Sequence, residues 1–257
     1  MLLLRGRAGY WCNLASFAAL LAANLATASL PFGNRPSRES SHGLHALLTP
    51  AGYTLSIWLL IYGLLAGWVL YPLLRPARGL FSAPPMPIRF LLSCLFSIAW
   101  VTLDDRHPLL SLAALLLLVS AVASMYRTTR HIVRPTAAEI GLVRLPFSLY
   151  FGWVSVTALA SIDAFLADTH LLGSPLANSP WQPGLPLLLL AFGLLTACRV
   201  GFRWRDALVP LTFAWGYGAI AAEPQLHRAV AFASGAGALA LTVYALWLSF
   251  LRSSERD

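Results

Sequence analysis

Eight apolar segments constrain the fold of this chain more than any other feature. A bilayer core of about 30 Å is crossed by about 20 helical residues. Charged residues make up only 11% of the chain, against about 25% in soluble domains. We therefore predict an all-α fold, a polytopic transmembrane helical bundle of about eight spans. The expected spans are 9–32, 51–74, 87–104, 108–126, 144–166, 184–199, 206–222 and 228–251.

The distribution of arginine supports this number of spans independently of hydropathy. Loops on the cytoplasmic side of a membrane carry the excess of basic residues. With eight spans, fourteen arginines fall at the termini and in the second, fourth and sixth loops, and four fall on the other side: Arg35, Arg38, Arg106 and Arg228. The split predicts that the N- and C-termini are both cytoplasmic.

The first span has two interpretations. Arg5 and Arg7 precede an apolar run, and Ala26–Ala28 resembles the end of a cleaved signal peptide. The run is longer than the 7–15 residues of a signal core, and it contains Asn13 and Asn24. We expect the span to be retained, while cleavage would leave seven spans.

Composition and motifs exclude several functions. All eighteen basic residues are arginine, so a retinal Schiff base, which needs a lysine amine, cannot form. The net charge of +8 follows from arginine in the loops, and we predict no nucleic-acid partner. Phosphate-binding loops, zinc-protease helices, nucleophile elbows and paired catalytic carboxylates are missing from the sequence. We therefore predict no catalytic residues and no enzymatic activity.

Three aromatic motifs follow one another along the spans. The second span begins with P-x7-W-x3-Y, formed by Pro50, Trp58 and Tyr62. The third contains S-x-x-W, formed by Ser97 and Trp100. The fifth contains a proline, tyrosine and tryptophan element at Pro146, Tyr150 and Trp153.

In this order the motifs resemble those of the TspO/MBR family, the tryptophan-rich sensory and translocator proteins, with Ser97 in the place of an asparagine. The resemblance covers residues 9–167. It implies a TspO-like five-helix bundle at 1–170, and residues 171–257 are similar to a three-helix extension found in long bacterial homologues. The first loop, 33–50, contains no tryptophan, whereas the family's lid over its pocket is rich in tryptophan.

The resemblance implies a small hydrophobic or planar ligand, similar to a porphyrin or a sterol, held for sensing or transport. Aromatic rings can sandwich such a ligand, and their N–H or O–H groups can orient it. Tryptophan and tyrosine also gather at membrane interfaces whatever the function. The predicted lining residues are Trp58, Tyr62, Ser97, Trp100, Tyr150, Trp153 and Thr157. We expect no resident cofactor, although a tetrapyrrole could be the ligand.

Two other functions remain open. A secondary transporter of a small solute would show internal repeats and broken helices, and the sequence has no convincing repeat. An intramembrane enzyme would use Asp163 or the pair Asp104 and Asp105. Asp163 lies near the end of the fifth span, where it is either a functional acid within the membrane or a solvated loop acid.

The remaining expectations concern partners and location. His42 and His45 lie three apart in the first loop, but two ligands without a third predict no metal site. Gly63 and Gly67 form a G-x-x-x-G pair, which permits close helix packing within the chain or in a homodimer. Arginine without lysine, together with frequent Ala, Gly and Pro, indicates a GC-rich bacterial genome. We therefore expect a multi-pass protein of the bacterial cytoplasmic membrane.

Overall fold

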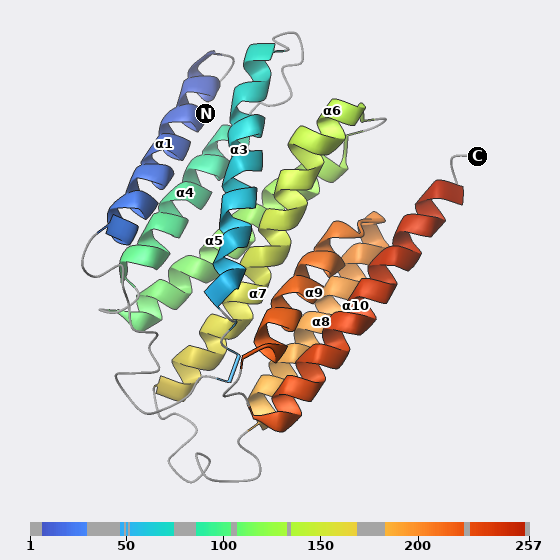
Figure 1. Cartoon of the computed structure of the whole chain (residues 1–257). Helices are drawn as coiled ribbons and strands as arrows, with labels where there is room; N and C mark the ends of the chain where they lie inside the picture. Colours follow the sequence, from blue (N-terminus) through green and yellow to red (C-terminus); the bar gives the residue numbers. More distant parts are fainter. Residues whose placement is uncertain are drawn as a thin grey trace. The chain divides into compact units, whose positions relative to one another are not determined.

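The computed structural model describes residues 7–29, 47–48, 50, 52–74, 86–103, 107–132, 135–168, 183–223 and 227–254, and within these ranges every regular element is helical. Eight of the helices have 14 or more residues (Figure 1). They are α1 (Arg7–Ser29), α3 (Ser56–Leu74), α4 (Met86–Leu103), α5 (Pro108–Arg130), α7 (Leu145–Asp168), α8 (Gly184–Trp204), α9 (Leu208–Ala221) and α10 (Arg228–Ser254). This confirms the predicted all-α fold.

Five helical segments in the described part of the chain are long and apolar enough to cross a membrane: Met86–Leu103, Pro108–Arg130, Ala137–Ala167, Gly184–Trp204 and Arg228–Leu251. Apolar stretches of α3 and α9, Ser56–Pro72 and Leu208–Ala221, are shorter. The finding confirms a multi-pass membrane protein. The cytoplasmic placement of the termini stays a prediction.

The helix ends differ from the predicted spans where polar residues continue a helix. α5 runs to Arg130 and α8 to Trp204, four and five residues beyond the predicted ends. Hydropathy marks the apolar part of a helix, whereas backbone hydrogen bonds continue into its arginine-bearing last turn. The second span begins as a 3₁₀ turn, η1 (Gly52–Leu55), before α3.

The chain divides into two compact units. Unit 1 comprises residues 1–35 and 58–151, and unit 2 comprises residues 36–57 and 152–257. The boundary falls inside α7, so that one continuous helix contributes its first part to unit 1 and its remainder to unit 2. These units describe packing; the division into a 1–170 bundle and a 171–257 extension stays a prediction.

In unit 1, α4 packs against both α1 and α5 (Figure 1). Two hydrogen bonds fix the ends of the α4–α5 pair. At one end, Arg89 donates to the Thr128 hydroxyl over 2.8 Å. At the other end, the Ser111 hydroxyl donates to the Trp100 carbonyl oxygen over 3.0 Å.

A short irregular helix leads into α7. Thr136 and Glu139 form a reciprocal capping box at the start of α6 (Ala137–Glu139). This arrangement satisfies backbone N–H groups that a helix start leaves without intrahelical partners. The π-helix η3 (Ile140–Arg144) follows and continues directly into α7.

In unit 2, α8, α9 and α10 pack against one another. The turn between α8 and α9 is tight. Arg205 adopts the left-handed conformation with φ 48°, and Asp206 N–H donates to the Gly201 carbonyl over 3.0 Å. The Asp206 carboxylate then accepts the Leu208 N–H over 3.1 Å at the start of α9.

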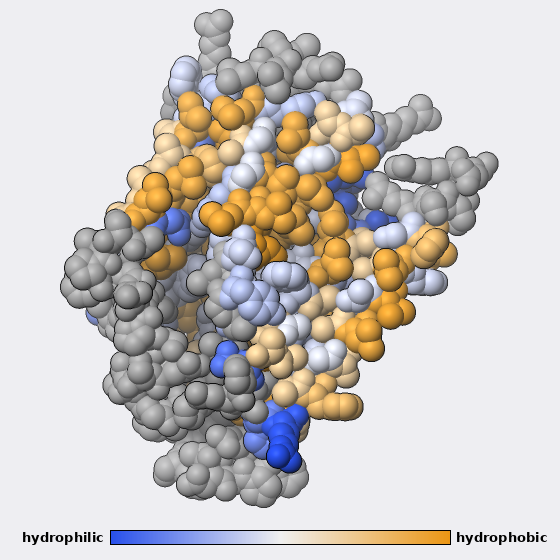
Figure 2. Space-filling view, in the orientation of Figure 1, coloured by the Kyte–Doolittle hydropathy of each residue, from blue (hydrophilic) through white to orange (hydrophobic). Residues whose placement is uncertain are grey.

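Large apolar side chains remain exposed on the helices of unit 2. On α8 they follow a helical spacing through Leu188, Phe192 and Leu195, and on α10 through Phe232, Leu239 and other residues. Figure 2 shows apolar residues over much of the described surface of one face. A soluble monomer rarely exposes such surface, so these stripes are the expected contact with lipid.

Candidate ligand-binding site

Trp58 is the centre of an aromatic cluster in unit 1. Its ring centroid lies 5.4 Å from that of Tyr62, 6.3 Å from that of Trp100 and 6.1 Å from that of Tyr150. Trp58 and Tyr62 are one turn apart on α3, whereas Trp100 and Tyr150 come from α4 and α7. We call Trp58, Tyr62, Trp100 and Tyr150 the aromatic cluster.

The cluster combines one buried ring with three partly exposed ones. Tyr150 is 1% exposed, while Trp58, Tyr62 and Trp100 are intermediate. Partly exposed rings that meet at a buried one can accept a further ring by offset or edge-to-face packing.

The Tyr150 phenol is a buried polar group without a hydrogen bond. Its oxygen is inaccessible to solvent, and no polar atom in the described part of the chain meets hydrogen-bond geometry with it. The Ser97 hydroxyl of α4 lies close to this phenol, and the Asn24 side chain of α1 lies close to the phenol of Tyr62. Ser97 is itself 1% exposed. The predicted serine therefore lies beside the polar tip of the cluster.

Trp153 and Thr157 belong to unit 2. Trp153 is 3% exposed, and the Thr157 hydroxyl donates to the Trp153 carbonyl over 3.0 Å. That bond uses the hydroxyl within α7 itself. The structure thus brings together five of the seven predicted lining residues within unit 1, and the share of Trp153 and Thr157 in a pocket stays a prediction.

A second set of aromatic rings in unit 1 was missed by the sequence analysis. Trp68 is 1% exposed, and its ring centroid lies 4.8 Å from that of Phe90 and 5.1 Å from that of Phe147. Trp68 Nε1 is buried without a hydrogen-bond partner among the described residues. Its spacing from Trp58 gave no signal, because ten residues turn a helix by about 1000° and leave the two side chains about 80° apart around the axis.

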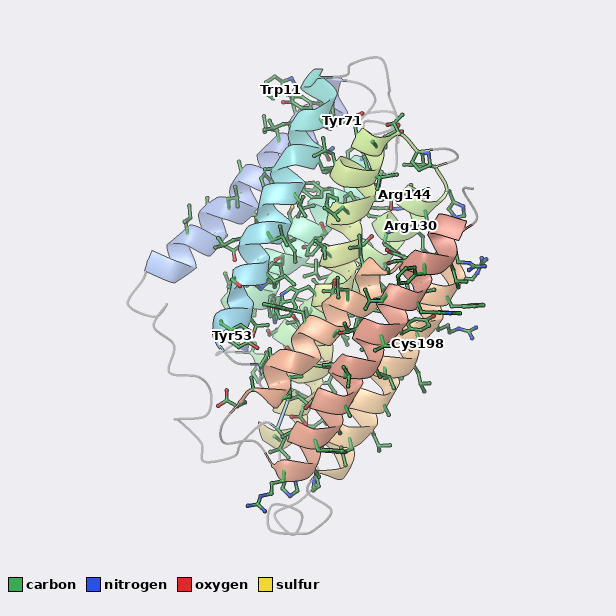
Figure 3. All side chains as sticks on the ribbon, turned by 45° about the vertical axis from the view of Figure 1, so that its right-hand side comes forward. Trp11, Tyr53, Tyr71, Arg130, Arg144 and Cys198 are labelled. Carbon is green, nitrogen blue, oxygen red and sulfur yellow. The ribbon has the colours of Figure 1, made fainter. Side chains whose placement is uncertain are left out.

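The described arginines of α4, α5 and η3 make their contacts away from the aromatic cluster. Arg89 is paired with Thr128 at the opposite end of α4 from Trp100. Arg130 donates to the Ser148 hydroxyl, and Arg144 donates to the Ile132 carbonyl over 2.8 Å. Figure 3 shows Arg130 and Arg144 near one another on the ribbon.

Asp163 is buried inside α7 rather than solvated beyond its end. It is 3% exposed, and its carboxylate accepts the backbone N–H of Leu48 over 2.9 Å. The interpretation of Asp163 as a solvated loop acid is therefore wrong, because α7 continues to Asp168. Both groups belong to unit 2, where the carboxylate fixes the backbone just before η1.

The other predicted candidates contribute little to a site. His42, His45 and Asp104–Arg106 lie outside the described residues, and the described part holds no group of three metal-ligating side chains. In the G-x-x-x-G pair, a Cβ at Gly67 would meet Leu142 of η3 at 3.0 Å, whereas a Cβ at Gly63 would meet nothing within 4 Å. Gly67 thus packs a neighbour within the chain.

Comparison with known proteins gives one match. The family described as TSPO-like protein matches residues 10–247. No curated protein and no solved structure matches the chain. The match covers the last three helices as well as the first five, so the comparison does not separate a C-terminal extension from the rest.

Proposed function

This chain belongs to the TSPO-like protein family, and we propose that it binds a small hydrophobic or planar ligand at the aromatic cluster of unit 1, for sensing or transport. The ligand has the general character of a porphyrin or a sterol. The role is binding, without catalysis.

One observation carries the proposal: the Trp58 ring meets three further rings from three helices, and the one that is buried, Tyr150, has a phenol beside the Ser97 hydroxyl for which no group in the described part of the chain meets hydrogen-bond geometry. Burying a polar group without a partner is unfavourable. Ligand sites in proteins combine apolar and aromatic walls with a few oriented polar groups. The cluster has that composition.

We further propose a bacterial cytoplasmic membrane location with both termini in the cytoplasm, which rests on the arginine asymmetry. The aromatic cluster then lies toward the arginine-poor side, because Trp100 is at the end of α4 opposite Arg89. We also propose that α8, α9 and α10 enlarge the bundle or offer a surface to a second copy.

Intrinsic tryptophan fluorescence tests the proposed binding. The purified protein is titrated in detergent with protoporphyrin IX, haem and a sterol, alongside Trp58→Ala and the control Trp247→Phe. Trp247 is an exposed tryptophan of α10. We expect saturable quenching that Trp58→Ala weakens roughly tenfold or more, as for loss of a central aromatic contact, and that Trp247→Phe leaves at the same midpoint. Equal midpoints in all three proteins would contradict the assignment.

A further inference from the structure

The exposed apolar stripe of α8 in unit 2 continues into arginine. Leu188, Phe192 and Leu195 follow one another at steps of four and three residues, and each is more than half exposed. The next step of four reaches Arg199, and a further step of four reaches Arg203; both are exposed. Residues at these spacings are neighbours on one helix face. The two arginines therefore lie on the face of α8 that we expect to contact lipid.

The two arginines also lie at the depth of lipid headgroups. Arg203 follows Gly184, the first residue of α8, by nineteen positions, which is about 28 Å along a helix axis. The hydrocarbon core of a bilayer is about 30 Å thick. Arg199 lies one turn earlier, and an arginine so near the end of a span extends its guanidinium group to the interface. Both guanidinium groups are therefore expected at the level of the phosphates.

Positive charge exceeds negative charge at this end of α8. A third exposed arginine, Arg205, follows directly after the helix. The acidic residue in the segment 199–206 is Asp206, which is 2% exposed and accepts the Leu208 N–H. The helix C-terminus adds a partial charge of about half a unit. Like charges one turn apart, such as Arg199 and Arg203, disfavour each other, so an anion placed between them would be stabilised.

Aromatic rings hold two of these arginines at the surface. The Arg203 guanidinium carbon lies 5.2 Å from the ring centroid of Trp204, and that of Arg205 lies 5.8 Å from the ring centroid of Phe202. Both distances are within the range of a cation–π interaction. Phe202 is 58% exposed, three residues after Arg199 on the same stripe. Cationic groups and an apolar surface are thus presented side by side.

We propose that Arg199 and Arg203, together with Arg205, form a binding site for the headgroup of an anionic phospholipid. The guanidinium N–H groups donate to the phosphate oxygens, a geometry that suits arginine. The acyl chains lie along Leu188, Phe192 and Leu195, which a free phosphate ion would leave uncovered. The site goes beyond the proposed function and does not depend on ligand binding at the aromatic cluster.

Native mass spectrometry of the full chain in detergent tests the site. The chain is titrated with dioleoylphosphatidylglycerol and dioleoylphosphatidylcholine, which share their acyl chains and differ in net charge. We expect the first phosphatidylglycerol to bind at least about tenfold more tightly than the first phosphatidylcholine, since each arginine near an anionic headgroup contributes roughly fivefold. Soluble sn-glycerol 1-phosphate should not bind at the same concentrations. Binding of this compound as tightly as phosphatidylglycerol would overturn the lipid assignment in favour of a free phosphate.

Single substitutions locate the site. Arg199→Gln and Arg203→Gln should each weaken the binding of phosphatidylglycerol roughly fivefold and leave phosphatidylcholine unchanged. Arg203→Lys keeps the charge and should keep most of the affinity. The matched control is Arg228→Gln, because Arg228 is an exposed arginine of unit 2 at the start of α10, separated from Arg205 by the length of α9. This control should bind both lipids as the unmodified chain does.

Three results would overturn the site. They are equal affinity of the unmodified chain for the two lipids, an unchanged preference for phosphatidylglycerol in both Arg199→Gln and Arg203→Gln, and an equal loss in Arg228→Gln. The last would show attraction to the overall positive charge of the chain. A fluorescence titration without any response to hydrophobic ligands would overturn the proposed function and leave this lipid site standing.

Discussion

Tyr150 in unit 1 and Tyr217 in unit 2 are both 1% exposed, but their phenols differ in hydrogen bonding. The Tyr217 phenol donates to the Leu190 carbonyl over 2.6 Å. A second tyrosine of unit 2, Tyr244, donates to the Cys198 carbonyl over 2.9 Å. The Tyr150 phenol finds no such carbonyl among the described residues, and neither does the indole N–H of Trp68 in the same unit.

The space around individual helix glycines also differs between the two units. In unit 2, a Cβ added at Gly193 would lie 2.3 Å from Tyr217 Oη, and one added at Gly216 would lie 2.6 Å from Val156. In unit 1, the space around Gly63 is open to 4 Å. Gly193 and Gly216 of unit 2 therefore lie in close helix contacts and Tyr217 there is hydrogen-bonded, whereas in unit 1 Gly63 is exposed and the Tyr150 phenol and Trp68 indole have no partner among the described residues. That difference favours unit 1 as the unit that binds a ligand.

Gly193→Ala should have the largest effect. The added methyl group overlaps Tyr217 Oη and Leu159 in a packed interior, so we expect a loss of about 3 kcal/mol in unfolding free energy. Titration with SDS in mixed micelles measures this loss. Gly63→Ala in unit 1 is the matched control, and it should be neutral or stabilising by up to about 1 kcal/mol. Equal losses in the two variants would remove the packing difference between the units.

Asp163→Ala should have the next largest effect. It leaves the buried Leu48 N–H without its acceptor, and an unsatisfied buried donor costs about 2 kcal/mol. Hydrogen exchange at the Leu48 amide should become faster. Asp163→Asn keeps an acceptor oxygen and should lose less. Unchanged exchange at Leu48 in Asp163→Ala would show that the carboxylate does not fix this backbone.

Removing the two buried phenols should have opposite consequences. Tyr217→Phe loses its hydrogen bond to Leu190, so we expect a loss of about 1 kcal/mol in unfolding free energy. Tyr150→Phe in the ligand-free protein removes a buried phenol that has no hydrogen-bond partner among the residues that the structure describes, so we expect no loss or a slight gain. Both variants are measured by the same unfolding titration. A larger loss for Tyr150→Phe would contradict the contrast between the units.

Arg205→Gly should have the smallest effect and should be stabilising. Arg205 has φ 48°, a conformation that glycine adopts without a steric penalty. We expect a net gain of about 0.5 kcal/mol, because relief of the left-handed conformation, worth about 1 kcal/mol, is partly offset by the greater freedom of glycine in the unfolded chain. Arg203→Gly is the control because Arg203 is still within α8, and it should destabilise. A loss in both variants would show that the Arg205 side chain matters more than its backbone conformation.

Much of the fold could be predicted because a bilayer imposes a simple rule. Each crossing must satisfy its backbone hydrogen bonds internally, so an apolar segment of sufficient length becomes a helix. The structure has a helix at each predicted segment. The segment at 206–222 is one of the shorter helices, Leu208–Ala221, because the turn at Arg205–Ala207 occupies its start.

The candidate site could be predicted only in part. The motif spacing selected Trp58 and Tyr150, which lie in one cluster, and Trp153, which belongs to the other unit. Trp68 stood in no recognised motif, yet it is the centre of a buried set of rings. Tryptophan is common both in pockets and at membrane interfaces, and its position along one helix does not show which helix it faces.

The sequence by itself determined an all-α membrane protein of the TSPO-like family, because hydropathy, arginine counts and motif order are properties of the chain read along its length. Which buried polar groups find partners was decided only by the tertiary structure. Asp163 meets Leu48 across 115 positions, and Tyr217 meets Leu190 across 27. The Tyr150 phenol has no hydrogen-bond partner among the described residues. Whether a buried polar group forms a hydrogen bond depends on distances of a few ångströms between helices, and the packing of the helices sets those distances.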